Sequence, residues 1–285
     1  MAVSEHAPIA APEPSREIVY RHSLVVRVTH WINFLCLTLL LMSGLKILSV
    51  HPALYWGNYG YRGAPSIASI NGFYDPETQR PVGQTRIGSY SFDTTGFLGL
   101  VYDSDGRAQA RTFPEWAMLG DDLALARDWH FLMAWLFVIN GAVYLLYGLI
   151  SGHFRRDLAP GRTELRPRHV LSDIWNHLRR RLPRGEAAKR YNILQKLVYL
   201  TVVFVLLPAI VLSGLTMSPA MTSLMPFLFD LFAGRQSART IHFIAANLLL
   251  LFVLVHLAEI LLSGAFNLMR SMITGRYTVR PERQS

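Results

Sequence analysis

Two histidines in one apolar segment are the residues of this chain best placed to do chemistry. His242 and His256 lie fourteen residues apart within residues 241–262. An α-helix turns about 100° per residue, so fourteen steps return a side chain to within about 40° of its first direction, about 21 Å further along the axis. Both imidazoles therefore face one side, one near each end of the segment. A histidine inside a membrane-spanning helix is costly and usually functional.

Four stretches are apolar and long enough to position such residues in a bilayer, which takes about 20 residues per helix. They are residues 24–50, 128–150, 193–217 and 240–263. The 285-residue chain is 51% hydrophobic and 16% charged, whereas soluble domains are about 25% charged. We therefore expect an all-α membrane protein built as a four-helix bundle. The single cysteine, Cys36, excludes an internal disulfide, and the chain has no C-x-x-C-H motif for covalent haem attachment.

The distribution of charge predicts the orientation in the membrane. The loop 151–192 holds eleven Lys and Arg against four Asp and Glu, the loop 51–127 six against eight, and the tail 264–285 four against one. Basic residues favour the cytoplasmic side. We expect both termini (1–23 and 264–285) and the basic loop in the cytoplasm, with 51–127 and the short loop 218–239 on the periplasmic side of a bacterial inner membrane. The basic loop is typical of topology determinants or lipid contacts rather than of a nucleic-acid site.

This orientation orders the histidines by depth. The first and second spans carry one histidine each, His30 near the cytoplasmic face and His130 near the periplasmic face. We expect His30 and His256 to hold the iron of an inner haem b, and His130 and His242 the iron of an outer haem b, because two neutral imidazoles are a normal axial set. The alternative is that such histidines bond neighbouring helices or relay protons. We assign no ligand role to the other six histidines, which are His6, His22, His51, His153, His169 and His177.

An arginine precedes three of these four histidines by three residues. The arginines are Arg27, Arg127 and Arg239. Residues three apart share a helix face, and a guanidinium matches the geometry of a carboxylate. We therefore expect these arginines to pair with haem propionates. The alternative is that they are interfacial arginines that extend toward water at helix ends.

The cytoplasmic ends of the third and fourth spans predict a quinone site. They offer hydrogen-bonding and ionisable groups at Tyr191, Asn192, Gln195, Lys196 and Glu259. A quinol releases protons together with its electrons, so such groups are expected beside the inner haem. The alternative is that Asn192 and Gln195 only start a helix and that Lys196 extends toward water.

Small residues recur at similar places in the first and third spans. Ser43-Gly44-Leu45 and Ser213-Gly214-Leu215 are examples. A glycine inside a span permits the close approach of a neighbouring helix or of a ligand, and the sequence leaves both open. Pro208 is central in the third span and is expected to kink it.

The start of the first span resembles a known family. Residues 27–31 read R-V-T-H-W, which is similar to the R-x-x-H-W opening of the bacterial dihaem b-type cytochromes. These are the membrane subunits of nickel–iron hydrogenases, formate dehydrogenases and thiosulfate reductases, and the resemblance covers roughly residues 20–275. It implies four spans, two haem b groups ligated by His30, His130, His242 and His256, and electron transfer between a quinone pool and an extracytoplasmic enzyme.

The loop 51–127 is longer than the family pattern implies. Loops of such length are usually functional or disordered. This one has aromatic ends and an alternating middle with turn signals, which indicates a small ordered cap with one hairpin. Its length disfavours a hydrogenase partner, and we expect a periplasmic molybdopterin oxidoreductase of the thiosulfate reductase or sulfite-oxidase-like kind.

The sequence thus predicts a dihaem cytochrome b subunit that passes electrons between the membrane quinone pool and a periplasmic redox enzyme subunit. The chain itself is expected to do quinol or quinone chemistry at most, because the haem carries the redox step. Two alternatives remain. One is a stand-alone quinone oxidoreductase acting on a small oxidant at the outer haem. The other is a haem-free membrane protein that relays protons or transports a solute, which no repeat or broken helix pair supports.

Overall fold

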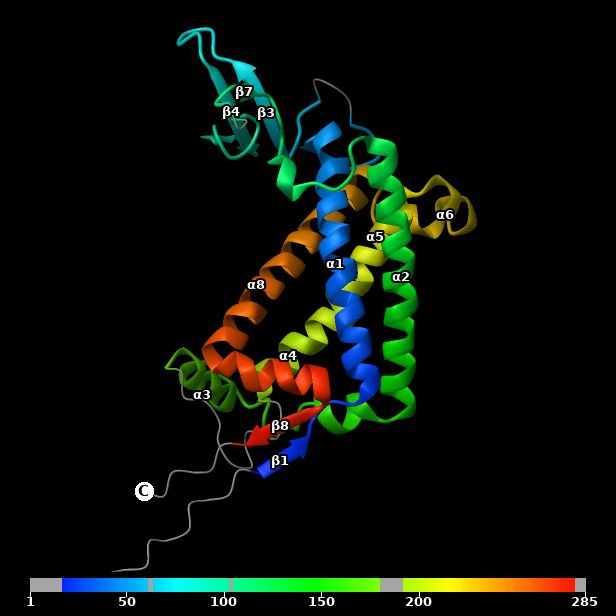
Figure 1. Cartoon of the computed structure of the whole chain (residues 1–285). Coiled ribbons are helices and arrows are strands. Elements are labelled where there is room, and N and C mark those ends of the chain that lie inside the picture. Colours follow the sequence, from blue (N-terminus) through cyan, green and yellow to red (C-terminus); the bar gives the residue numbers. More distant parts are fainter. Residues whose placement is uncertain (1–16, 61–63, 103–104, 180–191, 280–285) are drawn as a thin grey trace, which may run out of the picture.

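The computed structural model describes residues 17–60, 64–102, 105–179 and 192–279. In this part of the chain, four helical segments are long and apolar enough to cross a membrane, as predicted (Figure 1). They are α1 (Leu24–Val50), α2 (Leu123–Ile150), the segment Ile193–Met217 and α8 (Arg235–Thr274). The second and fourth helices are longer than the apolar stretches that predicted them, because polar residues extend both beyond the hydrophobic core.

Side-chain caps set where these helices begin. The hydroxyl of Ser23 accepts a hydrogen bond from the Val26 amide, and the carboxylate of Asp122 accepts one from the Leu125 amide. Each cap satisfies a backbone donor that the first helical turn leaves without a partner. Asp122 therefore starts α2 five positions before residue 128, where the apolar pattern alone begins.

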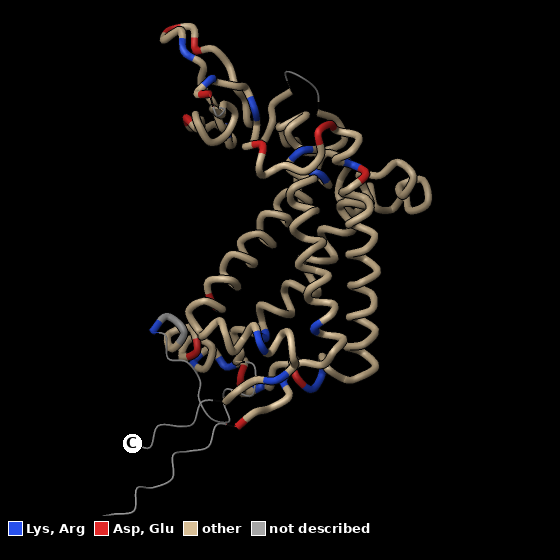
Figure 2. Tube along the Cα trace, viewed as in Figure 1, with Lys and Arg blue, Asp and Glu red and all other residues tan. Residues whose placement is uncertain are grey.

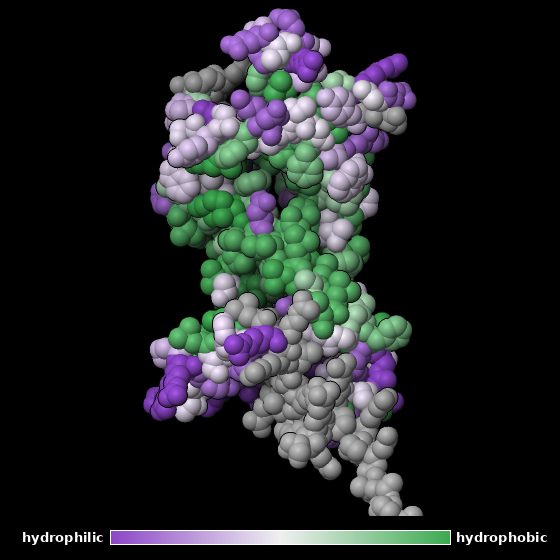
Figure 3. Space-filling model, turned by 90° about the vertical axis from the view of Figure 1, so that its left-hand side faces the viewer, coloured by the Kyte–Doolittle hydropathy of each residue, from purple (hydrophilic) through white to green (hydrophobic). Residues whose placement is uncertain are grey.

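Charged and apolar residues divide the molecule into layers. Lys, Arg, Asp and Glu gather at the two ends of the bundle and are sparse between them (Figure 2). A belt of hydrophobic surface lies between the two polar ends and is hollowed on the face shown in Figure 3. This layering, together with the four apolar helices, is that of a multi-pass membrane protein. We call the end that carries residues 51–122 the insertion end and the opposite end, where both ends of the described chain lie, the terminal end.

The helices pack as two pairs. α1 lies along α2, with Cys36, Met133 and Phe137 forming a buried cluster between them. The buried Asn140 of α2 also donates to the backbone carbonyl of Thr29 on α1 at 2.8 Å. The other pair is α5 (Leu207–Met217) and α8, and the two pairs face each other across the middle of the bundle (Figure 1).

The third span is interrupted where Pro208 was expected to kink it. It consists of α4 (Ile193–Thr201), one π-helical turn (Val202–Leu206) and α5. Proline has no backbone N–H to donate and its ring crowds the preceding turn. The π-helical turn immediately before Pro208 accommodates both effects, because its hydrogen bonds reach one residue further along the chain.

The two ends of the described chain meet at the terminal end. α8 breaks at Gly264, which has φ 105° and ψ 74°, and its last part turns across the end of the bundle (Figure 1). Strand β1 (Glu17–Tyr20) pairs antiparallel with β8 (Arg276–Val279). Part of the expected N-terminal tail is therefore a strand, while residues 1–15, which the sequence led us to expect as tail, lie outside the described residues. On the same end lies the amphipathic helix α3 (Pro167–Leu178).

The insertion is richer in strands than the one hairpin that was predicted, so the all-α class describes only the membrane part. A four-stranded antiparallel sheet has the order β2 (Ala53–Leu54), β3 (Ala68–Tyr74), β4 (Pro81–Ile87) and β5 (Tyr90–Asp93). A smaller pair follows, β6 (Val101–Tyr102) with β7 (Ala108–Gln109). Short strands with one exposed face carry a weak sequence signal, because burial rather than propensity decides them.

Both ends of the insertion are bonded to the bundle. The hydroxyl of Thr240 on α8 donates to the Tyr55 carbonyl at 2.6 Å, and the Leu119 amide donates to the Met42 carbonyl of α1 at 3.1 Å. Two short helices, α6 (Pro219–Leu224) and α7 (Phe227–Leu231), connect the third span to α8 on the same side. The insertion therefore closes the bundle at this end.

Candidate functional site

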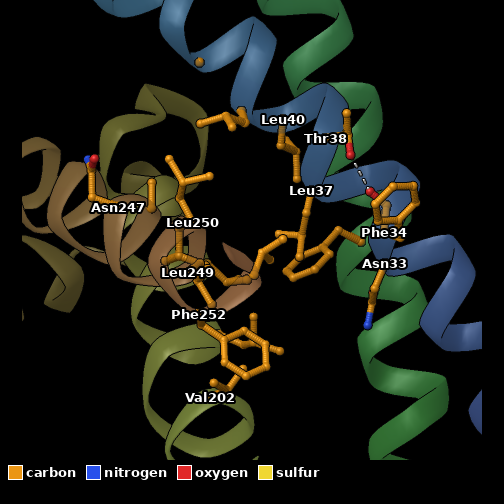
Figure 4. A pocket seen from close by; sticks show the side chains of 18 of the residues that line it. Asn33, Phe34, Leu37, Thr38, Leu40, Val202, Asn247, Leu249, Leu250 and Phe252 are labelled. Atoms are coloured by element: carbon orange, nitrogen blue, oxygen red, sulfur yellow. Dashed lines mark hydrogen bonds between the residues drawn. The ribbon is translucent and has the colours of Figure 1, made fainter. Parts of the chain in front are cut away.

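A large cavity lies between the two helix pairs. Its volume is about 2270 Å³, more than twice the roughly 1,000 Å³ at the upper end of ordinary ligand pockets. All four histidines singled out in the sequence line it: His30, His130, His242 and His256. Between the two levels of histidine the wall is mostly apolar, with Asn33, Thr38 and Asn247 as its polar members. Figure 4 shows this part, with Leu37 and Leu40 of α1 facing residues of α8 such as Leu250 and Phe252.

The structure brings the histidines together in the two pairs expected from their depth. His30 of α1 lies opposite His256 of α8 with ring centroids 6.3 Å apart and an interplanar angle of 69°. His130 of α2 lies opposite His242 of α8 at the same 6.3 Å, with an angle of 58°. We call them the terminal-end pair and the insertion-end pair.

The separation within each pair has a direct chemical meaning. An imidazole nitrogen lies about 1.1 Å from its ring centroid and binds a metal ion at about 2.0–2.1 Å, so two imidazoles on opposite sides of one metal have centroids about 6.2–6.4 Å apart. Both observed separations are 6.3 Å. A haem iron already has four porphyrin nitrogens, so two imidazoles complete its coordination. The spacing of both pairs therefore fits the axial positions of a haem.

Hydrogen bonds hold His242 in the tautomer that a metal-binding histidine needs. Its Nδ1 lies 2.9 Å from the backbone carbonyl of Ile210 and 3.1 Å from Oγ of Ser213. A carbonyl can only accept a hydrogen bond, so Nδ1 carries the proton and Nε2 keeps its lone pair. The Ser213 hydroxyl donates in turn to the Ala209 carbonyl at 2.6 Å. This chain of bonds fixes the orientation of the ring, as the hydrogen-bonding partners of metal-bound histidines do.

His130 is supported in the same way within the other helix pair, α1 and α2. Its Nδ1 lies 3.0 Å from Oγ of Ser43 on α1. The Ser43 hydroxyl donates to the Leu39 carbonyl at 2.6 Å, so its oxygen is free to accept from the histidine. Ser43 and Ser213 were not predicted as site residues. Their sequence signal was the repeated Ser-Gly-Leu triplet, which had been weighed only for its glycines.

The glycines of these triplets make room for the imidazoles. A Cβ at Gly44 would lie 3.4 Å from Cε1 of His130, and a Cβ at Gly214 would lie 3.3 Å from Cε1 of His242. Each triplet thus supplies a hydrogen bond to Nδ1 and a gap for the ring edge. The sequence left open whether these glycines admit a neighbouring helix or a ligand. In the structure they admit the histidine side chain of a neighbouring helix.

Two of the three predicted arginines line the cavity. Arg127 and Arg239 do so one helical turn from the insertion-end pair, and Arg239 also donates to the His51 carbonyl. Arg27 is not among the lining residues. Its Nη1 donates to the Ile273 carbonyl at 2.5 Å, while its Nε is buried without a hydrogen-bond partner among the described residues.

The terminal end of the cavity has a histidine that the sequence analysis set aside. His22 lies just before α1 and lines the cavity together with Arg21. Burial first, and then the positive charge of Arg21, lower the pKa of His22 from 6.5 to about 4. His22 is therefore neutral at physiological pH. An uncharged side chain at this position suits a cavity that holds an apolar ligand.

The residues predicted to bind quinone are also at this end. Asn192, Gln195 and Glu259 line the cavity. Asn192 and Gln195 form a reciprocal capping box at the start of α4, so their side chains also serve the helix end. Tyr191 lies outside the described residues.

Lys196 is engaged elsewhere. Its Nζ lies 2.9 and 3.0 Å from the two carboxylate oxygens of Glu164, and it is not among the residues that line the cavity. A hydrogen bond from the Gly161 amide, and then the Lys196 ammonium, hold the pKa of Glu164 below its ordinary value. This ion pair ties the segment before α3 to α4.

Fold and site together define a class: a multi-pass membrane protein whose helices bring paired histidines into one apolar cavity that fits haem. The chain belongs to the prokaryotic cytochrome b561 family, whose model matches residues 21–275. Membership of a cytochrome b family implies haem b and a role in membrane electron transfer. The haem-free alternative is therefore not supported.

One curated relative and the solved structures complete the comparison. The chain is 27% identical over 248 residues to a protein of Azospira oryzae named as a protein-methionine-sulfoxide reductase subunit, YedZ1. The match covers 87% of this chain and 93% of that relative. No solved structure matches the chain.

Proposed function

We propose that this chain binds two haem b groups and passes electrons across a bacterial inner membrane, from the quinone pool to a redox enzyme on the periplasmic side. One haem is held by the terminal-end pair, His30 and His256, and the other by the insertion-end pair, His130 and His242. When bound, haem b supplies the one-electron carrier, and the protein supplies its ligands, orientation and surroundings.

One observation carries the proposal. Two histidine pairs with the same 6.3 Å ring separation line one cavity, one pair toward each end of the bundle. A single haem would need one pair only. The fourteen-residue spacing of His242 and His256 separates the two levels by about 21 Å along α8, which is the greater part of the roughly 30 Å hydrocarbon core.

The arginines near each level are proposed to bind haem propionates. Arg127 and Arg239 line the cavity beside the insertion-end pair. Arg27 serves the terminal-end pair, where its buried Nε has no hydrogen-bond partner among the described residues. Guanidinium groups favour carboxylates in a bidentate geometry.

The quinone site is proposed at the terminal end of the cavity, beside His30 and His256. Its polar candidates are Asn192, Gln195 and Glu259, which line the cavity, whereas Lys196 pairs with Glu164 instead. The excess of basic residues in 151–192 and in the C-terminal tail supports a cytoplasmic position for this end. The reductase named in the Azospira oryzae relative consumes electrons, which supports flow from quinol toward the insertion end.

The insertion is proposed to dock the periplasmic enzyme, which we expect to be a molybdopterin oxidoreductase. Its surface exposes large aromatic side chains, with Tyr59 84%, Tyr90 72% and Trp116 80% exposed. Tyrosine and tryptophan are frequent anchors of protein interfaces. The bonds of Tyr55 and Leu119 to the bundle hold this surface next to the insertion-end pair.

Electron transfer in a defined membrane tests the proposal. The full chain is purified, placed in lipid nanodiscs and mixed with decylubiquinol, and haem reduction is followed by the absorption of the reduced α band. We expect quinol to reduce both haems in the wild type. In the Glu259→Gln and Asn192→Ala variants we expect slower reduction with an unchanged dithionite-reduced spectrum. Wild-type protein that dithionite reduces and quinol does not would refute the quinone role.

A deletion tests the docking role. Replacing residues 68–109 by a short linker removes the exposed strands and keeps the bonds that Tyr55 and Leu119 make to the bundle. We expect both haems and quinol-driven reduction to persist, while co-purification of the reductase from the native host is lost. Unchanged co-purification would refute the docking role of the sheet.

A further inference from the structure

A histidine–aspartate pair lies at the terminal end of the cavity, in a segment that has no role so far. His153 follows α2 and lines the cavity, with its side chain 15% exposed. Its Nδ1 is 2.7 Å from Oδ2 of Asp157, whose side chain is 36% exposed. The pair therefore runs from the cavity wall toward the aqueous surface.

Local structure sets the orientation of this pair. One π-helical turn (Phe154–Leu158) follows His153 and is closed by the Ala159 amide, which donates to the Phe154 carbonyl at 2.7 Å. An ionised carboxylate only accepts hydrogen bonds, so Nδ1 of His153 carries a proton toward Asp157 and Nε2 keeps a lone pair. This is the arrangement in which an aspartate orients a histidine as a base.

The neighbours of His153 form an aromatic cluster, of which Tyr144 lines the cavity beside His153. The rings of Tyr144 and Tyr147 both lie 6.4 Å from the His153 ring. Phe154 lies 5.7 Å from Tyr144 and 5.3 Å from Phe204. Aromatic rings at such distances favour further offset or edge contacts. The Tyr144 ring beside His153 suits a flat ligand that is apolar on its faces and has hydroxyl groups at its edge.

His153 also shares the cavity with the terminal-end pair. His22, His30, His153 and His256 all line it. A ligand at this end of the cavity would thus meet a base in the same lining that holds the expected haem ligands. Deprotonation of the ligand and loss of its electron could then occur at one place.

We propose that His153, oriented by Asp157, is the base that accepts the protons of a lipid-soluble quinol at the terminal end of the cavity, a proposal that rests on the function proposed above. The quinol loses two electrons, one to each of the two ferric haems, and its two O–H bonds break in turn. Each proton forms an N–H bond at Nε2 of His153, and the imidazolium, stabilised by Asp157, releases it to the aqueous side before the next is accepted. The products are the quinone, two protons in water and two ferrous haems.

Steady-state kinetics of the haem-loaded full chain test this role, with decylubiquinol as the probe and ferricyanide added to reoxidise the haems. A general base contributes about 10²–10⁴-fold to a rate, so His153→Ala should lower kcat about 100-fold or more and change KM little. Added imidazole should restore part of the rate. His153→Gln, which keeps a donor toward Asp157 but has no base, should be equally slow. Asp157→Asn should also lower kcat, with the dithionite-reduced spectrum unchanged in all three.

The chain offers a matched control. His169 and Asp173 are another histidine and aspartate four residues apart, on α3, and neither lines the cavity. The double variant His169→Ala and Asp173→Asn should keep the wild-type kcat. His153→Gln protein with intact haems and a wild-type kcat would overturn the role of His153 while leaving the proposed function in place. Wild-type protein that quinol does not reduce would instead overturn the proposed function.

Discussion

The two serines that bond the insertion-end histidines allow a quantitative prediction. In the double variant Ser43→Ala and Ser213→Ala, the Nδ1 atoms of His130 and His242 lose hydroxyl partners at 3.0 and 3.1 Å. The Ile210 carbonyl at 2.9 Å remains as an acceptor for His242. The rings should therefore stay in place and the haem should still bind, but more weakly.

The size of the effect follows from the bonds removed. A neutral hydrogen bond contributes about 0.5–1.5 kcal/mol, which corresponds to roughly two- to twelvefold in affinity at 1.4 kcal/mol per factor of ten. Each single variant should weaken the insertion-end haem by that factor, and the double variant by about 1–3 kcal/mol in total. The lost bonds also make the ligands less basic, which favours ferrous iron and raises the reduction potential of that haem. A tenfold change in relative affinity is about 59 mV for one electron.

A redox titration of the purified variants, followed at the α band, measures this effect. One of the two haem transitions should move to higher potential while the other stays within error of the wild type. Ser49→Ala is the control, because the Ser49 hydroxyl also bonds a carbonyl of its own helix, at 2.6 Å from Lys46, and contacts neither histidine. The reasoning is refuted if the double variant keeps both potentials, or if both shift equally.

Three further outcomes are expected. Gly214→Val should lose the insertion-end haem, because a Cβ alone would already lie 3.3 Å from an imidazole carbon. A Cβ at Gly141 would meet nothing within 4 Å, so Gly141→Val is the control and should keep both haems. A pyridine haemochrome assay measures both variants. Asn140→Ala should weaken the packing of α1 on α2 by about 0.6–1.7 kcal/mol, which is the contribution of an interhelical hydrogen bond in a membrane. Unfolding in detergent measures this loss. Asn247→Ala is the control and should not alter unfolding, because the Asn247 side chain bonds only its own helix. Because the pKa of Glu164 is lowered in the folded chain, its ion pair stabilises the fold fully above the ordinary value of 4.5 and is lost as pH falls through the folded pKa. The melting temperature of the chain should therefore fall as the pH is lowered below 4.5. Glu164→Gln should remove this part of the pH dependence.

The membrane part and the histidine pairs could be predicted because they rest on long-range regularities of the sequence. Apolar runs of about 20 residues have few alternatives to a spanning helix. The charge asymmetry then orders the spans, and the register of His242 and His256 fixes the levels at which His130 and His30 must meet them. The arrangement of the four helices could therefore be predicted with little knowledge of side-chain packing.

Features that depend on neighbours from other elements could not be predicted in this way. The Ser-Gly-Leu triplets were visible, but only packing reveals that their serines bond histidines on the adjacent helix. His153 was set aside as a residue at a span edge, although Asp157 four positions later was a local signal. The engagement of Lys196 with Glu164 depends on how the segment before α3 folds back, which the sequence pattern does not specify.

The insertion shows the same limit. Its alternating middle, residues 79–106, indicated a hairpin, and β4 with β5 forms one there. Strand β3 pairs with β4 from outside that stretch, and β2 and β5 (residues 53–54 and 90–93) are too short to stand out as strands alone. Their pairing with longer neighbours supplies the hydrogen bonds that make them strands.

The number of haems bound by each histidine pair tests the central claim most directly. A pyridine haemochrome assay of the purified chain, with protein measured by amino-acid analysis, should give two haem b per wild-type chain. His130→Ala and His30→Ala should each give one, with a low-spin spectrum from the pair that remains. One haem in the wild type, or two in either variant, would contradict the account.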